Sequence, residues 1–155
     1  TGTHATTALC LEWLDGQDLR GARVFDVGCG SGILAIAALA LGARHAVAMD
    51  IDPQALLATR ENAARNGVAE RLVVRPADAL WDAGFDVVLA NILAEPLVEL
   101  APRLAAAARP GGAVVLSGLL TAQAPDVATA FAPWFDMELP RERDGWAGLA
   151  GRRKV

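Results

Sequence analysis

A short glycine-rich segment, Asp26-Val27-Gly28-Cys29-Gly30-Ser31-Gly32, carries the strongest chemical signal in this sequence. Glycines at alternate positions permit positive φ and allow the backbone to approach a ligand closely. A helix that begins directly after such a loop points its free backbone N–H groups at an anionic or carboxylate-bearing ligand. The segment therefore predicts a ligand site at a turn between a strand and a helix, although any tight turn of this kind could use the same glycines.

A carboxylate, Asp50, stands at the predicted end of the next strand. At that position an acid can accept hydrogen bonds from both hydroxyls of a ribose, so the ligand is predicted to be a nucleoside. A dinucleotide loop needs its third glycine where this chain has Ile33, whereas the glycine here is Gly32. This spacing disfavours a nicotinamide-dependent dehydrogenase. A G-x-G-x-G loop preceded by an acid, here Asp26, is instead typical of S-adenosylmethionine methyltransferases.

The segment Asn91-Ile92-Leu93-Ala94 follows a predicted strand, at the edge where the ligand should lie. An asparagine there could simply cap a turn by bonding to neighbouring backbone. Its amide carbonyl is also suited to accept N–H bonds from an incoming amine, and its position favours this interpretation. Similar folds that methylate nucleic acid or glutamine have Asn/Asp-Pro-Pro-aromatic here. Because this chain lacks the aromatic ring that would stack on a flipped base, DNA modification is disfavoured.

Strands and helices are predicted to alternate along the chain, which implies an α/β fold with a doubly wound, mostly parallel, seven-stranded sheet of the Rossmann-like kind. Such sheets bind ligands at the carboxyl ends of their strands. Pro102 disturbs one predicted helix, and it could divide that helix into a short turn and a second helix starting at the proline. The predicted strands are 24–27, 45–49, 71–75, 85–90 and 113–117, with weaker candidates at 135–139 and 146–152, and the helices surround Leu9–Leu14, 33–42, 52–66, 97–108 and 123–131.

Composition limits the class of protein. The chain has 155 residues, of which 54% are hydrophobic, and a net charge of −4. These values predict one globular domain, with no general electrostatic attraction to nucleic acid. Cys10 and Cys29 fit neither a CxxC motif nor a zinc site, so we expect reduced thiols, a cytoplasmic location and no metal. No apolar run is long enough to span a bilayer, and we expect a monomer that does not bind membranes.

Five segments together resemble the ribosomal protein L11 methyltransferases of bacteria, and the resemblance spans essentially the whole chain. It implies a class I fold, S-adenosyl-L-methionine as cofactor, and a ribosomal large-subunit protein as substrate, methylated on lysine side chains and on its N-terminal amine. The segments are Thr1-Gly2-Thr3-His4-Ala5-Thr6-Thr7-Ala8-Leu9-Cys10-Leu11, residues 26–34, Asp50-Ile51-Asp52-Pro53, Asn62-Ala63 with Asn66-Gly67, and Asn91-Ile92-Leu93-Ala94.

The resemblance also implies roles for individual residues. Asn91 is the implied catalytic residue. The positions that match or adjoin the family's cofactor contacts are Thr3, Thr7, Asp26, Gly28, Gly30, Asp50, Ile51, Asp78 and Asn91. Among them, Asp78 stands where related methyltransferases contact the adenine amine. The family normally carries an N-terminal domain that grips the ribosomal protein. Residues 1–155 are therefore expected to be the catalytic domain alone, and a segment preceding Thr1 is expected to have been removed or to belong to another domain.

The implied reaction passes a methyl group in line from the sulfonium to a neutral amine held by Asn91. Deprotonating a lysine of pKa ~10.4 at pH 7 costs about 4–5 kcal/mol, and a dry pocket would lower that cost. The sequence offers no obvious general base, so catalysis is expected to depend on orientation and proximity. The alternative is a cofactor-binding, methyltransferase-like domain that acts on another amine, or that is inactive without the recognition domain.

Overall fold

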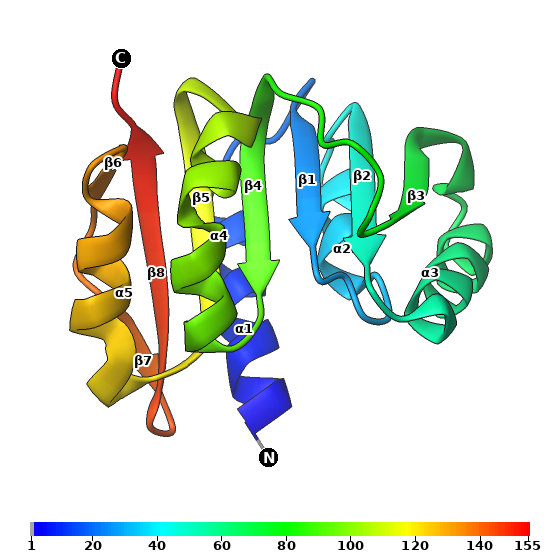
Figure 1. The fold of residues 1–155 in the computed structure, drawn as a ribbon. Helices are drawn as coiled ribbons and strands as arrows, with labels where there is room; N and C mark the ends of the chain where they lie inside the picture. Colours follow the sequence, from blue (N-terminus) through cyan, green and yellow to red (C-terminus); the bar gives the residue numbers. More distant parts are fainter. Residues whose placement is uncertain (1) are drawn as a thin grey trace.

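The structure, a computed structural model, describes residues 2–155, and it describes side chains from residue 5 onward. Helices cover both faces of one sheet whose strands run in the order β3-β2-β1-β4-β5-β8-β6, with β7 paired to β8 (Figure 1). None of the helices in residues 2–155 combines the length and apolarity that crossing a bilayer would need. The strands are β1 (Arg23–Val27), β2 (His45–Asp50), β3 (Leu72–Pro76), β4 (Phe85–Asn91), β5 (Ala108–Leu120), β6 (Phe135–Met137), β7 (Arg141–Arg143) and β8 (Trp146–Arg153).

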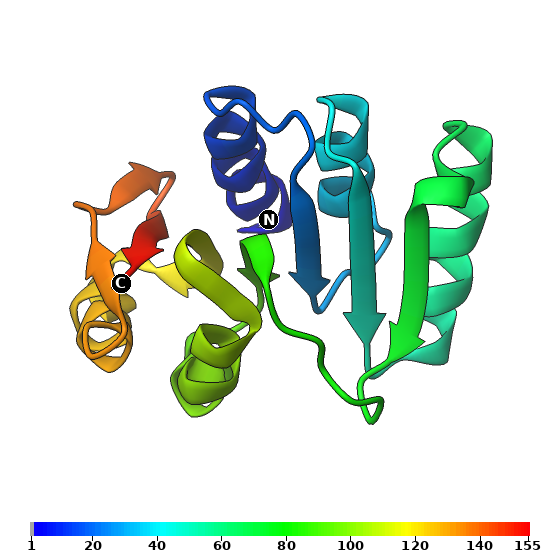
Figure 2. The ribbon, with the colours of Figure 1, turned by 90° about the horizontal axis from the view of Figure 1, so that it is seen from above.

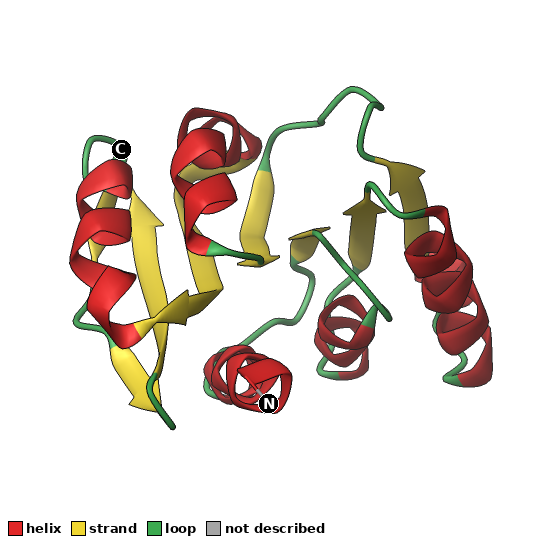
Figure 3. Cartoon of the chain, turned by 60° about the horizontal axis from the view of Figure 1, so that its bottom comes forward, coloured by secondary structure: helices red, strands yellow, loops and turns green. Residues whose placement is uncertain are grey.

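Within residues 2–155, five α-helices cover the sheet, three on one face and two on the other. Helices α1, α2 and α3 lie on one side of the sheet, and α4 and α5 lie on the opposite side, both in the view from above (Figure 2) and in the view with the bottom turned forward (Figure 3). Because strands β1, β2 and β4 are covered on both faces, their residues are nearly all buried, which explains their continuous apolar runs. The helices are α1 (Gly2–Asp15), α2 (Ile33–Ala40), α3 (Pro53–Arg65), α4 (Ala94–Ala107) and α5 (Ala124–Phe131), and short 3₁₀ turns lie at Ala69–Arg71 and Thr121–Gln123.

The strand directions place the candidate residues at one edge. Strands β1 to β5 pair with one another in parallel, whereas β8 is antiparallel to β5, β6 and β7. The chain order reverses between β1 and β4, which are neighbours in the sheet although β2 and β3 lie between them in the sequence. The carboxyl ends of β1, β2 and β4 therefore meet at this switch point, where open α/β sheets bind ligands.

Two differences from the sequence prediction have simple physical causes. The seven predicted strands are present, but an eighth, β7, was missed because all three of its residues are exposed and charged or polar. The predicted division of α4 at Pro102 is wrong, because the helix continues from Ala94 to Ala107. Pro102 and Val98, the residue one turn before it, both lie on the exposed side of α4. There the carbonyl that a proline displaces can turn to solvent.

Candidate functional site

The glycine loop after β1 adopts the conformation that its composition predicts. Gly28, Gly30 and Gly32 have φ values of 76°, 55° and 84°, which L side chains rarely adopt. The backbone N–H groups of Gly28 and Cys29 donate to the carbonyl of Met49 at 2.8 and 3.0 Å. The loop is thereby fixed to the end of β2, and Gly32 precedes the first residue of α2.

Side chains of helix α3 hold the same loop by hydrogen bonds. The hydroxyl of Thr59 donates to the Gly30 carbonyl at 3.0 Å, and the amide of Asn62 donates to the Ser31 carbonyl at 2.9 Å. A Cβ at Gly32 would stand only 2.7 Å from Cγ2 of the fully buried Thr59. Sequence reasoning missed Thr59, and a threonine inside a helical pattern gave no signal that could have identified it.

Asp50 links the loop to the start of α3. Its Oδ2 accepts the N–H of Gly30 and its Oδ1 accepts the N–H of Asp52, both at 2.9 Å. Asp52 in turn caps α3 by accepting the N–H of Gln54. Since each carboxylate oxygen has two lone pairs, Asp50 keeps acceptor capacity for a ligand hydroxyl.

Asp26 lies beneath the loop and is 1% exposed. Its Oδ2 accepts the N–H of Ala35 at 3.3 Å, while its Oδ1 has no hydrogen-bond partner among the described residues. Burial raises the pKa of Asp26 to about 7; the Ala35 hydrogen bond opposes this shift and the charge of Asp50 adds to it. The protein therefore holds a carboxyl group that is costly to ionise directly behind the loop.

A cavity of about 500 Å³ opens at the switch point. Gly28, Asp50 and Ile51, which is 88% exposed, belong to its lining. Arg103 and Trp81 also line it, and the Arg103 guanidinium lies 4.0 Å from the centre of the Trp81 ring, a cation–π contact. The complete lining is Val27, Gly28, Met49, Asp50, Ile51, Ala77, Trp81, Ile92, Leu93, Pro96, Leu100 and Arg103.

A second cavity of about 460 Å³ adjoins the first and shares Leu93 and Pro96 with it. Asn91 is the last residue of β4, half-buried, and pairs in register with Ser117 of β5. Ile92, the next residue, lines the first cavity. The strand end that carries Asn91 therefore lies beside the wall that the two cavities share. The second cavity is lined by Leu93, Ala94, Glu95, Pro96, Glu99, Gly118, Leu120, Gln123 and Trp146.

The remaining predicted residues lie around this site rather than in its wall. Gly30 is bonded to Asp50 but does not line either cavity. Thr7 is half-buried on α1, and Asp78 is exposed in the turn after β3, next to the lining residue Ala77. The side chain of Thr3 lies outside the described part of the chain.

The chemistry of other reactive groups is restricted. Burial raises the pKa of the Cys29 thiol to about 12, and its Sγ lies 3.4 Å from the Thr59 hydroxyl. Cys29 is therefore a small packing residue and not a nucleophile at neutral pH. Among the described side chains, those of residues 5–155, no three His, Cys, Asp or Glu residues are grouped closely enough to hold a metal ion.

A mostly parallel sheet of this strand order, with a glycine loop after its first strand and an acid after its second, defines the Rossmann-like class I fold of S-adenosylmethionine-dependent methyltransferases. Within this class, the family described as Ribosomal protein L11 methyltransferase (PrmA) matches residues 1–154, and the chain belongs to that family. The fold and the family resemblance predicted from the sequence are thus confirmed.

Individual relatives support this family assignment. Ribosomal protein L11 methyltransferases of Marinobacter nauticus and Pseudomonas aeruginosa are each 59% identical over 99% and 100% of this chain, but over only 52% and 53% of their own length. The chain thus spans about half of these relatives. The crystal structure of the ribosomal protein L11 methylase from Lactobacillus delbrueckii subsp. bulgaricus is 39% identical, with a TM-score of 0.90 over 99% of this chain and 81% of that one. An RNA methyltransferase from Salinibacter ruber, 22% identical, shares the fold with a TM-score of 0.76 over 99% and 93%.

Proposed function

We propose that this chain is the catalytic domain of an S-adenosyl-L-methionine-dependent protein methyltransferase whose substrate is ribosomal protein L11. The observation that carries the proposal is the cavity that joins Gly28 and Asp50 to the segment after Asn91. Such a cavity would bring a cofactor and an acceptor amine to the same strand edge. Membership of the L11 methyltransferase family supports this choice of substrate.

The residues present fit the proposed cofactor. The carboxylate of Asp50, already oriented by two backbone N–H groups, would accept the ribose hydroxyls. The apolar walls from Ile51 and Ile92 suit the adenine ring, and Asp78 would accept its amine. Gly28 allows close approach of the backbone, and the negative charge of Asp50 favours a cationic ligand. S-adenosyl-L-methionine supplies a methyl group on a sulfonium.

The acceptor amine would be held by Asn91, the proposed catalytic residue. Its side-chain carbonyl, together with the neighbouring backbone carbonyls, would accept the amine N–H bonds and aim the lone pair at the methyl group. No side chain in the lining of the two cavities is a histidine, and the glutamates Glu95 and Glu99 border only the second one. The ammonium would then lose its proton to solvent water before transfer, and the apolar surroundings would favour the neutral amine because they disfavour the charged form.

Lysine side chains and the N-terminal amine of the substrate are the acceptors that we propose, following the family resemblance. Because the chain spans about half of its relatives, we propose that substrate capture uses a part of the protein outside residues 1–155. We further propose that the protein acts as a monomer in the cytoplasm, where ribosomal proteins are made, and without direct contact to nucleic acid.

Calorimetric titration with S-adenosyl-L-methionine tests the cofactor, with NAD as the control ligand. Asp50→Asn should weaken binding at least about tenfold, since hydrogen bonds to a charged group contribute about 1.5–3 kcal/mol. Asp136→Asn, which changes an exposed carboxylate on β6, is the matched control and should leave binding unchanged. Binding of NAD instead, or equal behaviour of the two variants, would contradict the proposal.

Asn91→Ala tests the acceptor site in the full natural protein with ribosomal protein L11 as substrate. We expect at least about a hundredfold loss of methyl transfer, because orientation supplies much of the catalysis, with a much smaller change in cofactor affinity. Mass spectrometry of the product identifies the methylated amines. Equal losses of affinity and transfer would argue against the role of Asn91, and cofactor binding without any transfer by the wild type would favour the alternative of an inactive or differently directed domain.

A further inference from the structure

Two glycines from different parts of the chain enclose the residue that follows Asn91. Gly28 belongs to the loop after β1, and Gly118 lies in β5 at a point where the pairing with β8 shifts register. Both have positive φ, 76° and 92°. Both face Ile92, so the end of β4 is held between the loop of the proposed cofactor site and an irregular segment of β5.

The two glycines contact Ile92 in different ways. A Cβ at Gly28 would stand 2.5 Å from the Cγ2 of Ile92 and 4.0 Å from its Cβ, which is a side-chain contact. A Cβ at Gly118 would collide with the carbonyl oxygen of Ile92 and stand 2.8 Å from the carbonyl carbon and 3.1 Å from the nitrogen. The first overlap can be removed by shortening Ile92. The second cannot, because it involves backbone atoms.

The β5 segment has little freedom to move away from Ile92. Ser117, next to Gly118, pairs in register with Asn91 and is completely buried. Its hydroxyl donates to the carbonyl of Thr6 on α1 at 3.0 Å. A side chain at position 118 would therefore displace the Ile92 peptide rather than β5.

We infer that Gly118 is a positioning residue for methyl transfer. Because Gly118 has no side chain, β5 can contact the backbone of Ile92 directly. This contact fixes the position of the Asn91 side-chain amide and of the Ile92 carbonyl, which orient the acceptor amine. This inference rests on the proposed function of the site. Since displacements of about 1 Å reduce rates by about a hundredfold, a small shift of this peptide should strongly affect transfer.

The first test compares Gly118→Ala with Gly67→Ala in the full natural protein. Gly67 also has positive φ, 72°, but a Cβ there would meet no atom within 4 Å, so its variant reports backbone strain alone. For Gly118→Ala we expect at least about a tenfold loss of kcat, with cofactor affinity within about threefold of the wild type. Amide hydrogen exchange at residues 91–93 should be faster than in Gly67→Ala, with or without ligand.

The second test uses the different nature of the two contacts, with Ile92→Ala alone as the reference. Adding Ile92→Ala to Gly28→Ala should restore cofactor affinity toward that of the reference, because the overlapping methyl group is removed. Adding it to Gly118→Ala should not restore kcat, because the overlap with the backbone persists. Rescue of the second pair would overturn the inference.

Other outcomes separate this inference from the function on which it rests. If Gly118→Ala matches Gly67→Ala in kcat, affinity and hydrogen exchange, Gly118 does not position the peptide. Equal losses of kcat and affinity would likewise overturn the role. If the wild type neither binds S-adenosyl-L-methionine nor transfers methyl groups, the proposed function fails. The contact between Gly118 and Ile92 is tested separately, because unchanged hydrogen exchange at residues 91–93 in Gly118→Ala would show that Gly118 does not support Ile92.

Discussion

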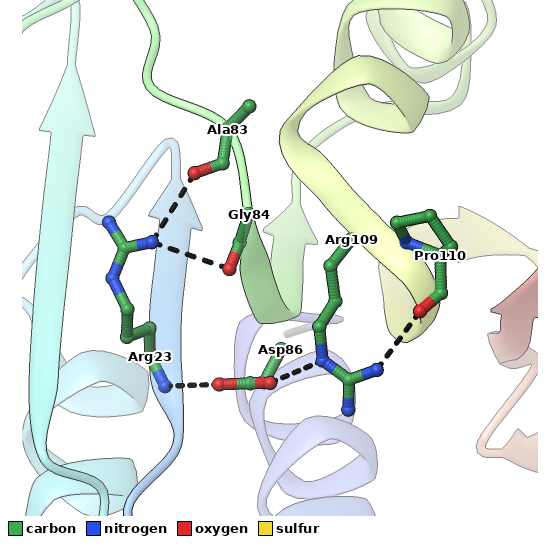
Figure 4. A network of polar contacts seen from close by, with 6 residues as sticks. All are labelled: Arg23, Ala83, Gly84, Asp86, Arg109 and Pro110. Atoms are coloured by element: carbon green, nitrogen blue, oxygen red, sulfur yellow. Dashed lines mark hydrogen bonds and ion pairs between the residues drawn. The ribbon is translucent and has the colours of Figure 1, made fainter.

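Aspartate side chains at the two ends of the parallel strands have opposite surroundings. At the amino end of β4, Asp86 accepts the backbone N–H of Arg23 at 2.8 Å and is paired with the Arg109 guanidinium (Figure 4). At the carboxyl end of β1, Asp26 is buried, and one of its oxygens has no partner among the described residues. At one end of the sheet a carboxylate is paired with arginines, while at the other end a carboxyl group is buried and costly to ionise.

The pKa values follow this difference. Partial burial opposes ionisation of Asp86, but hydrogen bonds from Arg23 and Arg109 and their charges hold its pKa below the ordinary value. Burial dominates at Asp26 and raises its pKa to about 7. At the amino end, Arg23 and Arg109 therefore stabilise the ionised form of Asp86. At the carboxyl end, burial and the charge of Asp50 disfavour the ionised form of Asp26.

The largest expected effect is that of Asp26→Asn on stability. The folded protein retains the Asp26 proton up to about pH 7, whereas the unfolded chain loses it near pH 3.8. Wild-type stability should therefore fall, relative to Asp26→Asn, as pH rises between these values, by on the order of 4 kcal/mol. Urea unfolding at pH 5 and pH 8 without ligand should capture about 2–3 kcal/mol of this fall. A pH-independent difference between the two proteins would show that Asp26 is ionised throughout.

A smaller effect of opposite sign is expected for Asp86→Asn. Because the folded-state pKa of Asp86 is lowered, its contribution to stability is present above the unfolded-state value and is lost as pH falls through the folded-state value. We expect a loss of about 1–2 kcal/mol at pH 7, which disappears under acidic conditions. Cofactor affinity should not change. A change in affinity comparable to that of Asp50→Asn would mean that the two ends of the sheet are not independent.

The smallest effect should come from a second amino-end pair. The Arg20 guanidinium donates to Asp18 at 2.9 and 2.7 Å, and these hydrogen bonds lower the pKa of Asp18 to about 2. Both side chains are largely exposed, so water and salt screen the interaction. Arg20→Ala should leave the urea midpoint unchanged within error. If Arg20→Ala clearly lowers the urea midpoint, and 1 M salt removes this difference, exposed ion pairs also stabilise the amino end of the sheet.

Local features were the most predictable from sequence. The loop glycines, the Asp52 cap and the strands with β-branched residues need only a few neighbouring residues, so their patterns are visible in the sequence. The continuity of α4 through Pro102 was not predictable in this way, because it depends on which side of the helix faces solvent. Strand β7 was missed for a related reason, since its pairing with β8, and not its composition, makes it a strand.

The sequence by itself therefore determined the fold class, the family, and the identity of the loop and of Asp50 and Asn91 as the candidate site. Only the tertiary structure decided what surrounds them: Thr59 bonded to the loop, Arg103 over Trp81 in the cavity lining, and Gly118 against the Ile92 backbone. These contacts join residues separated by 22 or more positions, and their existence depends on how close two packed elements come. Periodicity and motif spacing report only local conformation, so distances between elements have no signature in one sequence.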